Sequence, residues 1–189
     1  MPDYEFSADY VTSVASAWEQ HLASLRGRDE IRMLEIGSFE GRSALWFLEN
    51  LLTHPQSALV CVDKFAKDYS NVFDRNIAAS GLAQKVTKLS GKSEDVLPTL
   101  ADASFDAIYI DGDHRAEAVW HDARESWRLV KPGGIIIFDD YRWALHLPPE
   151  QRPKPAIDRF LAEYRSQLIV LHQGYQVIVR CCQSVELPS

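Results

Sequence analysis

The segment LEIGSFEGRS, residues 34–43, decides how this 189-residue chain folds. It joins an apolar run at residues 31–36 to a helical pattern at residues 42–53 through a turn that holds Gly37 and Gly41. Glycines let a backbone turn tightly and approach a ligand closely, and the free N–H groups at the start of a helix attract anionic groups. We therefore expect a strand, a ligand-binding turn and a helix; a turn that only shapes the fold is the alternative.

Further apolar runs of strand length alternate with helical patterns after this unit. Strands are expected at residues 58–63, 85–90, 105–111 and 134–140, and helices at 70–80, 93–100 and 115–129. A helix at 155–164 then precedes two apolar segments that flank Gln173 and Gly174, a pattern that predicts an antiparallel hairpin. The fold class is therefore α/β, with a doubly wound, mostly parallel seven-stranded sheet closed by a C-terminal hairpin.

An amphipathic pattern at residues 8–26 predicts a helix ahead of the first strand. We expect an N-terminal helical segment over residues 1–30 and one ligand-binding domain over residues 31–189. Near the end of that domain, residues 141–155 hold four prolines and no periodicity. They follow the carboxyl end of a strand, where ligands bind in open α/β sheets, so they are expected to form part of a substrate wall; a solvated linker is the alternative.

The composition narrows the classes of partner. The chain has 20 basic and 27 acidic residues and a formal net charge of −7 at pH 7, which disfavours nucleic acids and anionic membranes as partners. No apolar run has the length of a membrane-spanning helix, and the first residues show no secretory signal. Three cysteines, two of them adjacent, suit a reducing compartment. We expect a cytoplasmic protein, and a homodimer is possible.

The spacing of the glycine turn favours one kind of ligand over another. The pattern E-x-G-x-x-x-G-x-S differs from the dinucleotide pattern G-x-G-x-x-G, because Phe39 stands where the second glycine would fall. Glu35 is expected to meet a cation, and Ser43 a carboxylate. A ligand with an ammonium and a carboxylate fits this pair better than a diphosphate does.

Polar residues after the next two strands extend this site. Asp63 ends the strand at residues 58–63, and an acid there commonly accepts hydrogen bonds from both ribose hydroxyls of a nucleoside. Ser93 or Glu94, in the GKSED segment after the third strand, is expected at an adenine edge. Together with the glycine turn, these positions predict an adenosine-type cofactor.

Carboxylates gather after the fourth and fifth strands. Asp111 ends the fourth strand, and Asp139 and Asp140 end the fifth. Neighbouring strand ends lie close together, so these carboxylates raise one another's pKa unless a cation neutralises them; oxygen ligands select Mg²⁺, Ca²⁺ or Mn²⁺. The alternative is that Asp111 belongs to the cofactor site and the other two cap a turn. His114 follows Asp111 closely and is a candidate general base, although a lone histidine is more often structural.

Four motifs resemble those of class I S-adenosylmethionine-dependent methyltransferases. They are LEIGSFEGRS at residues 34–43, VTKLSGKSEDVLPTL at 86–100, FDAIYIDGDH at 105–114 and LVKPGGIIIFDDY at 129–141. The resemblance runs from about residue 32 to residue 181. It is to the catechol O-methyltransferase-like enzymes and to small bacterial methyltransferases with a D-G-x-H turn. It implies the Rossmann-like methyltransferase fold for the domain at 31–189.

The resemblance also implies residue roles. The methionine part of S-adenosylmethionine would contact the glycine turn and its flanks, namely Glu35, Gly37, Ser38, Phe39, Gly41 and Ser43. The ribose would contact Asp63 with Lys64 beside it, the adenine would contact Ser93 and Glu94, and Asp111 would also lie at the cofactor.

The metal-ligand positions of the catechol-type enzymes fall on Asp111, Asp139 and Asp140. Asp140 stands where those enzymes have an amide, and His114 stands where they place a lysine base. The expected reaction is O-methylation of a small hydroxylated molecule, with Asp111 and His114 as catalytic residues and a divalent cation assisting. The alternatives are a metal-independent methyltransferase, an NAD-dependent oxidoreductase and a cofactor-binding module without catalysis.

Overall fold

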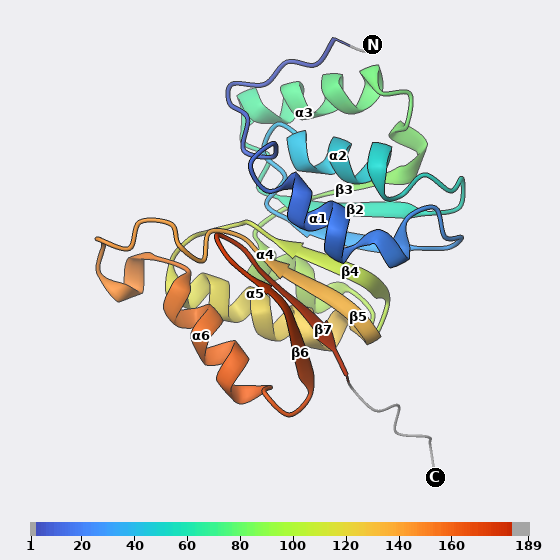
Figure 1. Ribbon diagram of the computed structural model, residues 1–189. Coiled ribbons are helices and arrows are strands. Elements are labelled where there is room, and N and C mark those ends of the chain that lie inside the picture. The colour runs from blue at the N-terminus through green and yellow to red at the C-terminus, as the bar shows by residue number, and fades with distance from the viewer. Residues whose placement is uncertain (1–2, 183–189) are drawn as a thin grey trace.

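The computed structural model describes residues 3–182, so the outermost residues of the two expected domains, 1–2 and 183–189, lie outside it. One seven-stranded sheet runs through the described part, with strand order β3-β2-β1-β4-β5-β7-β6 (Figure 1). Its strands are β1 Arg32–Ile36, β2 Ala58–Asp63, β3 Val86–Ser90, β4 Phe105–Ile110, β5 Val130–Phe138, β6 Leu168–Gln173 and β7 Val177–Cys181. The first five strands are parallel and the last two pair antiparallel, which confirms the predicted fold class and hairpin.

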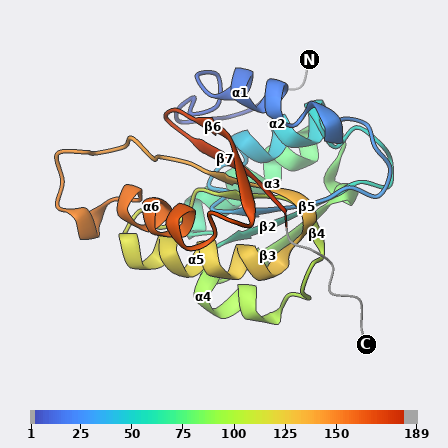
Figure 2. The ribbon, with the colours of Figure 1, turned by 60° about the horizontal axis from the view of Figure 1, so that its bottom comes forward.

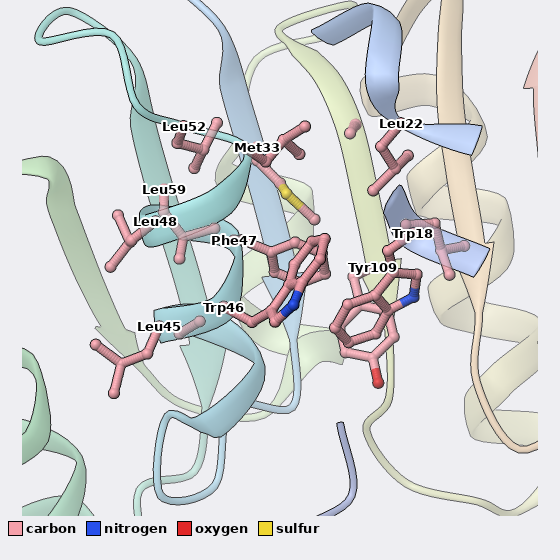
Figure 3. Packing of buried hydrophobic residues seen from close by; sticks show 14 of the residues in the cluster. Trp18, Leu22, Met33, Leu45, Trp46, Phe47, Leu48, Leu52, Leu59 and Tyr109 are labelled. Carbon is pink, nitrogen blue, oxygen red and sulfur yellow. The ribbon is translucent and has the colours of Figure 1, made fainter. Parts of the chain in front are cut away.

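Helices cover both faces of the sheet (Figure 2). One apolar core lies under α1 Ala15–His21, α2 Arg42–Asn50 and α3 Lys67–Ala79, where Trp18 and Phe47 are fully buried (Figure 3). The other lies under α4 Ser93–Val96, α5 Ala116–Leu129 and α6 Lys154–Glu163, around Phe138 and Phe160. Short 3-10 turns lie at Ala23–Leu25, Ala83–Lys85, Leu97–Thr99 and Pro149–Gln151. Among residues 3–182, no helix combines the length and apolar character needed to cross a membrane.

The N-terminal segment is less helical than the pattern at residues 8–26 predicts. The structure has α1 over Ala15–His21, followed by a 3-10 turn at Ala23–Leu25. The Asp9 carboxylate accepts hydrogen bonds from the backbone N–H groups of Val11 and Thr12, which holds the residues before α1 in a turn. Trp18 and Leu22 are fully buried, so the apolar face that suggested a helix does pack on the sheet.

Strand β5 begins earlier than expected, because the glycine-rich stop after α5 lies inside the strand. Val130 pairs with Phe105, and the register then shifts before Ile135 pairs with Ala107. The residues between them include Gly133, whose backbone φ is +80°. A glycine in this conformation suits an irregular stretch in a strand. The stop therefore ends α5 at Leu129 as predicted and also bends the start of β5.

Gly37 sits where the ends of three strands meet. Its N–H donates to the carbonyl oxygen of Val62, and the N–H of Asp111 donates to the carbonyl oxygen of Ile36. Its φ is +87°, and a Cβ built on it would lie 2.0 Å from the backbone oxygen of Asp111. No side chain fits at that distance, so a glycine is required here for space as well as for backbone conformation.

We expect Gly37→Ala to lower the free energy of unfolding by about 3 kcal/mol or more, because the φ cost adds to a backbone clash. Gly81→Ala is the matched control, since Gly81 has φ +71° but no atom within 4 Å of its Cβ position. That variant should lose only about 1–2 kcal/mol. Urea unfolding of both variants measures the difference. Equal losses would mean that the close contact with Asp111 costs nothing.

Candidate active site

A cavity of about 410 Å³ opens at the carboxyl ends of β1, β2 and β4, where ligands bind in open α/β sheets. The structure brings most of the predicted cofactor residues to its wall: Gly37, Ser38, Phe39, Ser43, Asp63, Lys64, Ser93, Glu94 and Asp111. Gly41 is not on the wall; it precedes α2 with φ +84°, and a Cβ there would touch Phe73. Gly41 therefore contributes to the conformation of the turn and not to the cavity wall.

Asp63 fixes the shape of the glycine turn. Its Oδ2 atom accepts hydrogen bonds from the backbone N–H groups of Ser38 at 2.9 Å and Phe39 at 3.0 Å. Its Oδ1 atom accepts from the N–H of Phe65 at 2.8 Å. Phe39 has φ +47°, so the turn holds a non-glycine residue in the left-handed region. The carboxylate at the end of β2 therefore organises the turn as well as lining the cavity.

Glu35 lies behind the cavity wall. Its side chain is fully buried, and its carboxyl group accepts hydrogen bonds from the Ser43 hydroxyl at 2.6 Å and the Cys61 thiol at 3.4 Å. Burial raises the pKa of Glu35 to about 7, against the lowering effect of its hydroxyl donors. Glu35 therefore does not line the cavity, whereas Ser43, which donates to it, does.

A second cavity, of about 650 Å³, meets the first one at Asp111, Phe39 and Tyr10. Its wall carries four carboxylates, one imidazole and several aromatic rings, from Asp9, Asp111, Asp139, Asp140, His114, Tyr10, Phe39, Trp143 and Tyr175. Trp143 comes from the proline-rich segment at residues 141–155, which supports the reading of that segment as part of a substrate wall. Among the described residues 3–182, no lysine or arginine is on the wall of this cavity.

His114 reaches two carboxylates across the second cavity. Its Nε2 atom lies 3.0 Å from Oδ2 of Asp140 and 3.8 Å from Oδ1 of Asp111, and its ring packs against Trp143 at 4.6 Å. Asp140 has φ +58°, and the Tyr175 hydroxyl donates to its Oδ1 atom at 2.6 Å. Asp111, His114 and Asp140 can each offer one ligand atom within 4.8 Å of the others, as a cation site requires.

Asp139 faces a different set of neighbours. The hydroxyl of Tyr109 and the side-chain amide of Gln176 both donate to its Oδ2 atom. The backbone N–H of Asp140 donates to its Oδ1 atom at 2.7 Å. Donors of the chain hold Asp139, whereas His114 lies beside Asp111 and Asp140. The metal-ligand set of Asp111, Asp139 and Asp140 stays a prediction.

The carboxylates and His114 shift one another's protonation. Burial and the charges of Asp139 and Asp140 raise the pKa of Asp111 to about 7, although the nearby imidazole of His114 opposes this. Burial likewise raises the pKa of Asp139. The neighbouring carboxylates of Asp111 and Asp140 raise the pKa of His114 above its ordinary value. Near neutral pH this group of residues can therefore both hold and release protons.

Sequence patterns missed several residues of the site. Tyr109 stood out only as one polar aromatic in an apolar strand, two residues before Asp111. Gln176 and Tyr175 lie in the hairpin, where nothing in the sequence connects them to Asp139 and Asp140.

A family described as a methyltransferase domain matches residues 34–141, which is more than half of the chain. The chain belongs to this family. Its motifs and its Rossmann-like sheet thus confirm the resemblance to methyltransferases. The matched part contains nearly all of the first cavity's wall, whereas Tyr10, Trp143 and Tyr175 of the second cavity lie outside it.

Curated relatives share about 30% sequence identity with this chain over the aligned residues. Catechol O-methyltransferase from Mycobacterium tuberculosis is 30% identical over 109 residues, 58% of this chain and 47% of that protein. The chain spans about half the length of the first curated relatives that it matches.

Solved structures share the fold of this methyltransferase domain. An O-methyltransferase from Bacillus cereus, in complex with S-adenosylhomocysteine, has a TM-score of 0.72 at 17% identity, covering 93% of this chain and 84% of that one. The O-methyltransferase of tomaymycin synthesis from Streptomyces achromogenes, in complex with S-adenosylmethionine, has a TM-score of 0.68 at 19% identity, covering 97% and 84%.

The buried Glu35 of the methyltransferase domain gives a pH-dependent stability. Its pKa is raised on folding, so the folded protein binds a proton that the unfolded chain has released, and stability falls as pH rises from about 4.5 through about 7. We expect Glu35→Gln to gain stability relative to the native chain between pH 5 and pH 8, by up to about 3 kcal/mol. Urea unfolding at both pH values measures this, with Glu19→Gln on the exposed side of α1 as the control. A stability difference that does not change with pH would contradict the prediction.

Proposed function

We propose that this protein uses S-adenosylmethionine to methylate a hydroxyl group of a small molecule. The observation that carries the proposal is the meeting of two cavities at Asp111. One cavity is built on the glycine turn of a methyltransferase domain and is lined by Asp63. The other is lined by carboxylates, His114 and aromatic rings. A donor in the first and an acceptor in the second would face one another at their junction, as an in-line transfer requires.

The wall of the first cavity fits S-adenosylmethionine by its chemistry. When bound, this cofactor supplies a methyl group on a positively charged sulfur. Asp63 offers carboxylate oxygens to ribose hydroxyls, and Ser93 and Glu94 offer polar atoms to an adenine edge. Ser43 lines the cavity near the start of α2, where free backbone N–H groups favour a carboxylate, while its hydroxyl donates to Glu35. When ionised, Asp111 at the junction would add negative charge that favours a positively charged sulfur.

In the second cavity, His114 is the residue that would take the acceptor's proton. Its imidazole faces the cavity and is oriented by Asp140 at 3.0 Å and by the ring of Trp143. Asp111 and Asp140 stabilise the imidazolium that forms when the proton arrives. The acidic wall without lysine or arginine suits a small hydroxylated molecule and disfavours nucleic acid.

A divalent cation would assist this reaction. Asp111 and Asp140, with Asp139 as the third ligand of the catechol-type pattern or His114 as the third ligand by proximity, are the residues that would bind it. A bound cation lowers the pKa of a hydroxyl that it contacts. An all-oxygen set favours Mg²⁺, Ca²⁺ or Mn²⁺, and a set that includes His114 shifts the preference toward transition metals such as Mn²⁺ or Fe²⁺. The pair of His114 and Asp140 also favours a second candidate, metal-independent methyl transfer with His114 as the only activating group.

We expect S-adenosylhomocysteine to stabilise the protein by about 2.7 kcal/mol at 100 times its Kd, and NAD to have no such effect. Asp63→Asn should weaken S-adenosylhomocysteine binding at least tenfold, because the amide weakens both the hydrogen bonds to the ribose and those that hold the glycine turn. Thermal shift and calorimetry measure both effects. Asp68→Asn, an exposed acid on α3, is the matched control. Stabilisation by NAD in place of S-adenosylhomocysteine would favour an oxidoreductase, and unchanged affinity of Asp63→Asn would remove this residue from the cofactor site.

Methyl transfer itself is tested with an isotope-labelled donor and a set of hydroxylated compounds. His114→Ala should lower kcat by about 10²–10⁴-fold and leave S-adenosylhomocysteine affinity nearly unchanged, because general-base catalysis is worth that much. His146→Ala, an exposed histidine outside both cavity walls, is the control. Exhaustive chelation should stop turnover of the native chain. Full activity after chelation would reject the cation and favour the metal-independent reaction. A protein that binds the cofactor but labels no compound would instead be a binding module.

A further inference from the structure

The side chain of Gln176 connects the N-terminal helix to the carboxylates of the active site. Gln176 is 1% exposed and lies between β6 and β7. Its Oε1 atom accepts a hydrogen bond from the indole Nε1 of Trp18 at 2.7 Å. Its Nε2 atom donates to Oδ2 of Asp139 at 2.9 Å. Three segments that are far apart in the sequence therefore meet at one buried amide.

Trp18 determines which way this amide faces. An indole nitrogen can only donate a hydrogen bond, so the atom of Gln176 that faces it must be the amide oxygen. The amino group then points at Asp139, where it can only donate. A flipped amide would set two donors against each other at Trp18 and two acceptors against each other at Asp139. The orientation of Gln176 is thus fixed by its two partners.

Tyr109 is the second donor to the same carboxylate. Its hydroxyl donates to Oδ2 of Asp139 and also lies 3.1 Å from Oδ2 of Asp111, so it bridges the two acids. The Trp18 ring packs against the Tyr109 ring with centroids 5.4 Å apart (Figure 3). Trp18 therefore supports both donors to Asp139, one through its N–H group and the other through its ring. The bridged Oδ2 atom of Asp111 leaves the Oδ1 atom to face His114.

This network lies where an apolar core would otherwise continue. Trp18 belongs to the same apolar cluster as Phe47 and Tyr109, and both Trp18 and Gln176 are buried. Buried polar groups add little net stability when satisfied and cost much when one partner is lost. Neither Trp18 nor Gln176 lies within the matched residues 34–141, so these contacts are contributed by segments that flank the matched part.

We propose that Gln176, oriented by Trp18, is a positioning residue that holds Asp139, and through Tyr109 also Asp111, in the arrangement that methyl transfer uses. The inference rests on the proposed function for its kinetic consequence. Partners that orient the residues of a reaction centre commonly change activity or metal affinity by 10–100-fold when removed. Gln176 lines neither cavity and contacts Asp139 from behind the second one, so its loss should act on the reaction and not on the binding of the cofactor.

The test compares two variants of the full chain with a matched control. Gln176→Met keeps a side chain of similar length and removes both hydrogen bonds. Trp18→Phe keeps an aromatic ring, although a smaller one, and removes the donor that orients the amide. Gln173→Met is the control, because Gln173 lies in the same hairpin but donates to Tyr141, away from the carboxylates. For each protein, kcat, the Kd of S-adenosylhomocysteine and the Kd of Mn²⁺ alone are measured, the last two by calorimetry.

We expect Gln176→Met to lower kcat at least tenfold, with S-adenosylhomocysteine affinity within twofold of the native chain. Trp18→Phe should show a smaller loss of the same kind, and it keeps the test decisive if Gln176→Met does not fold. Gln173→Met should behave as the native chain does. An unchanged kcat, or a loss of cofactor affinity in proportion to kcat, overturns the proposal.

Failure of the proposed function gives a different result from failure of this inference. If the native chain transfers no methyl group to any compound, the proposed function fails, and the positioning role is judged from Mn²⁺ alone. Mn²⁺ binding at least tenfold weaker in Gln176→Met than in the native chain and in Gln173→Met then supports the role. No difference among the three proteins overturns it.

Discussion

The close contact between Gly37 and the backbone of Asp111 sets the geometry of the whole carboxyl edge of the sheet. It continues the parallel ladder past the ends of β1 and β4, with the N–H of Gly37 on Val62 and the N–H of Asp111 on Ile36. The glycine turn follows this contact on the β1 side, and Asp111 follows it on the β4 side. The two cavities meet at Asp111, beside this contact.

The second constraint is the negative charge that this geometry gathers. Asp111, Asp139 and Asp140 stand at two neighbouring strand ends, and burial with mutual repulsion raises the pKa of the first two. The chain offsets the charge with donors, namely the imidazole of His114, the hydroxyls of Tyr109 and Tyr175, and the amide of Gln176. These donors are spread over β4, the loop after it and the hairpin. Because these donors are neutral or shared between carboxylates, the negative charge that they leave at this edge costs stability.

Much of this arrangement could be predicted from sequence, because it depends on local patterns. The glycine turn, Asp63 and the D-G-D-H segment each follow a strand with a clear apolar run, so their places at one edge follow from sheet topology. The role of Glu35 could not be read in the same way, since its burial behind Ser43 depends on which face of β1 it occupies. The role of Gln176 is still harder to predict from sequence. Its partners Trp18 and Asp139 are 158 and 37 residues away, and no local pattern records such a contact.

The residues that sequence patterns predicted and those that they missed lie largely in different parts of the molecule. Residues 34–141, which match the methyltransferase domain family, form nearly the whole wall of the first cavity. The second cavity takes Tyr10, Ser13 and Val14 from the N-terminal segment, Trp143 from the segment after β5, and Tyr175 from the hairpin. Such an arrangement would suit enzymes that share one methyl donor but use different acceptors, because a fold can keep one binding turn while its flanking segments change. The buried amide of Gln176 connects both flanking segments to Asp139, a carboxylate of the part that matches the family.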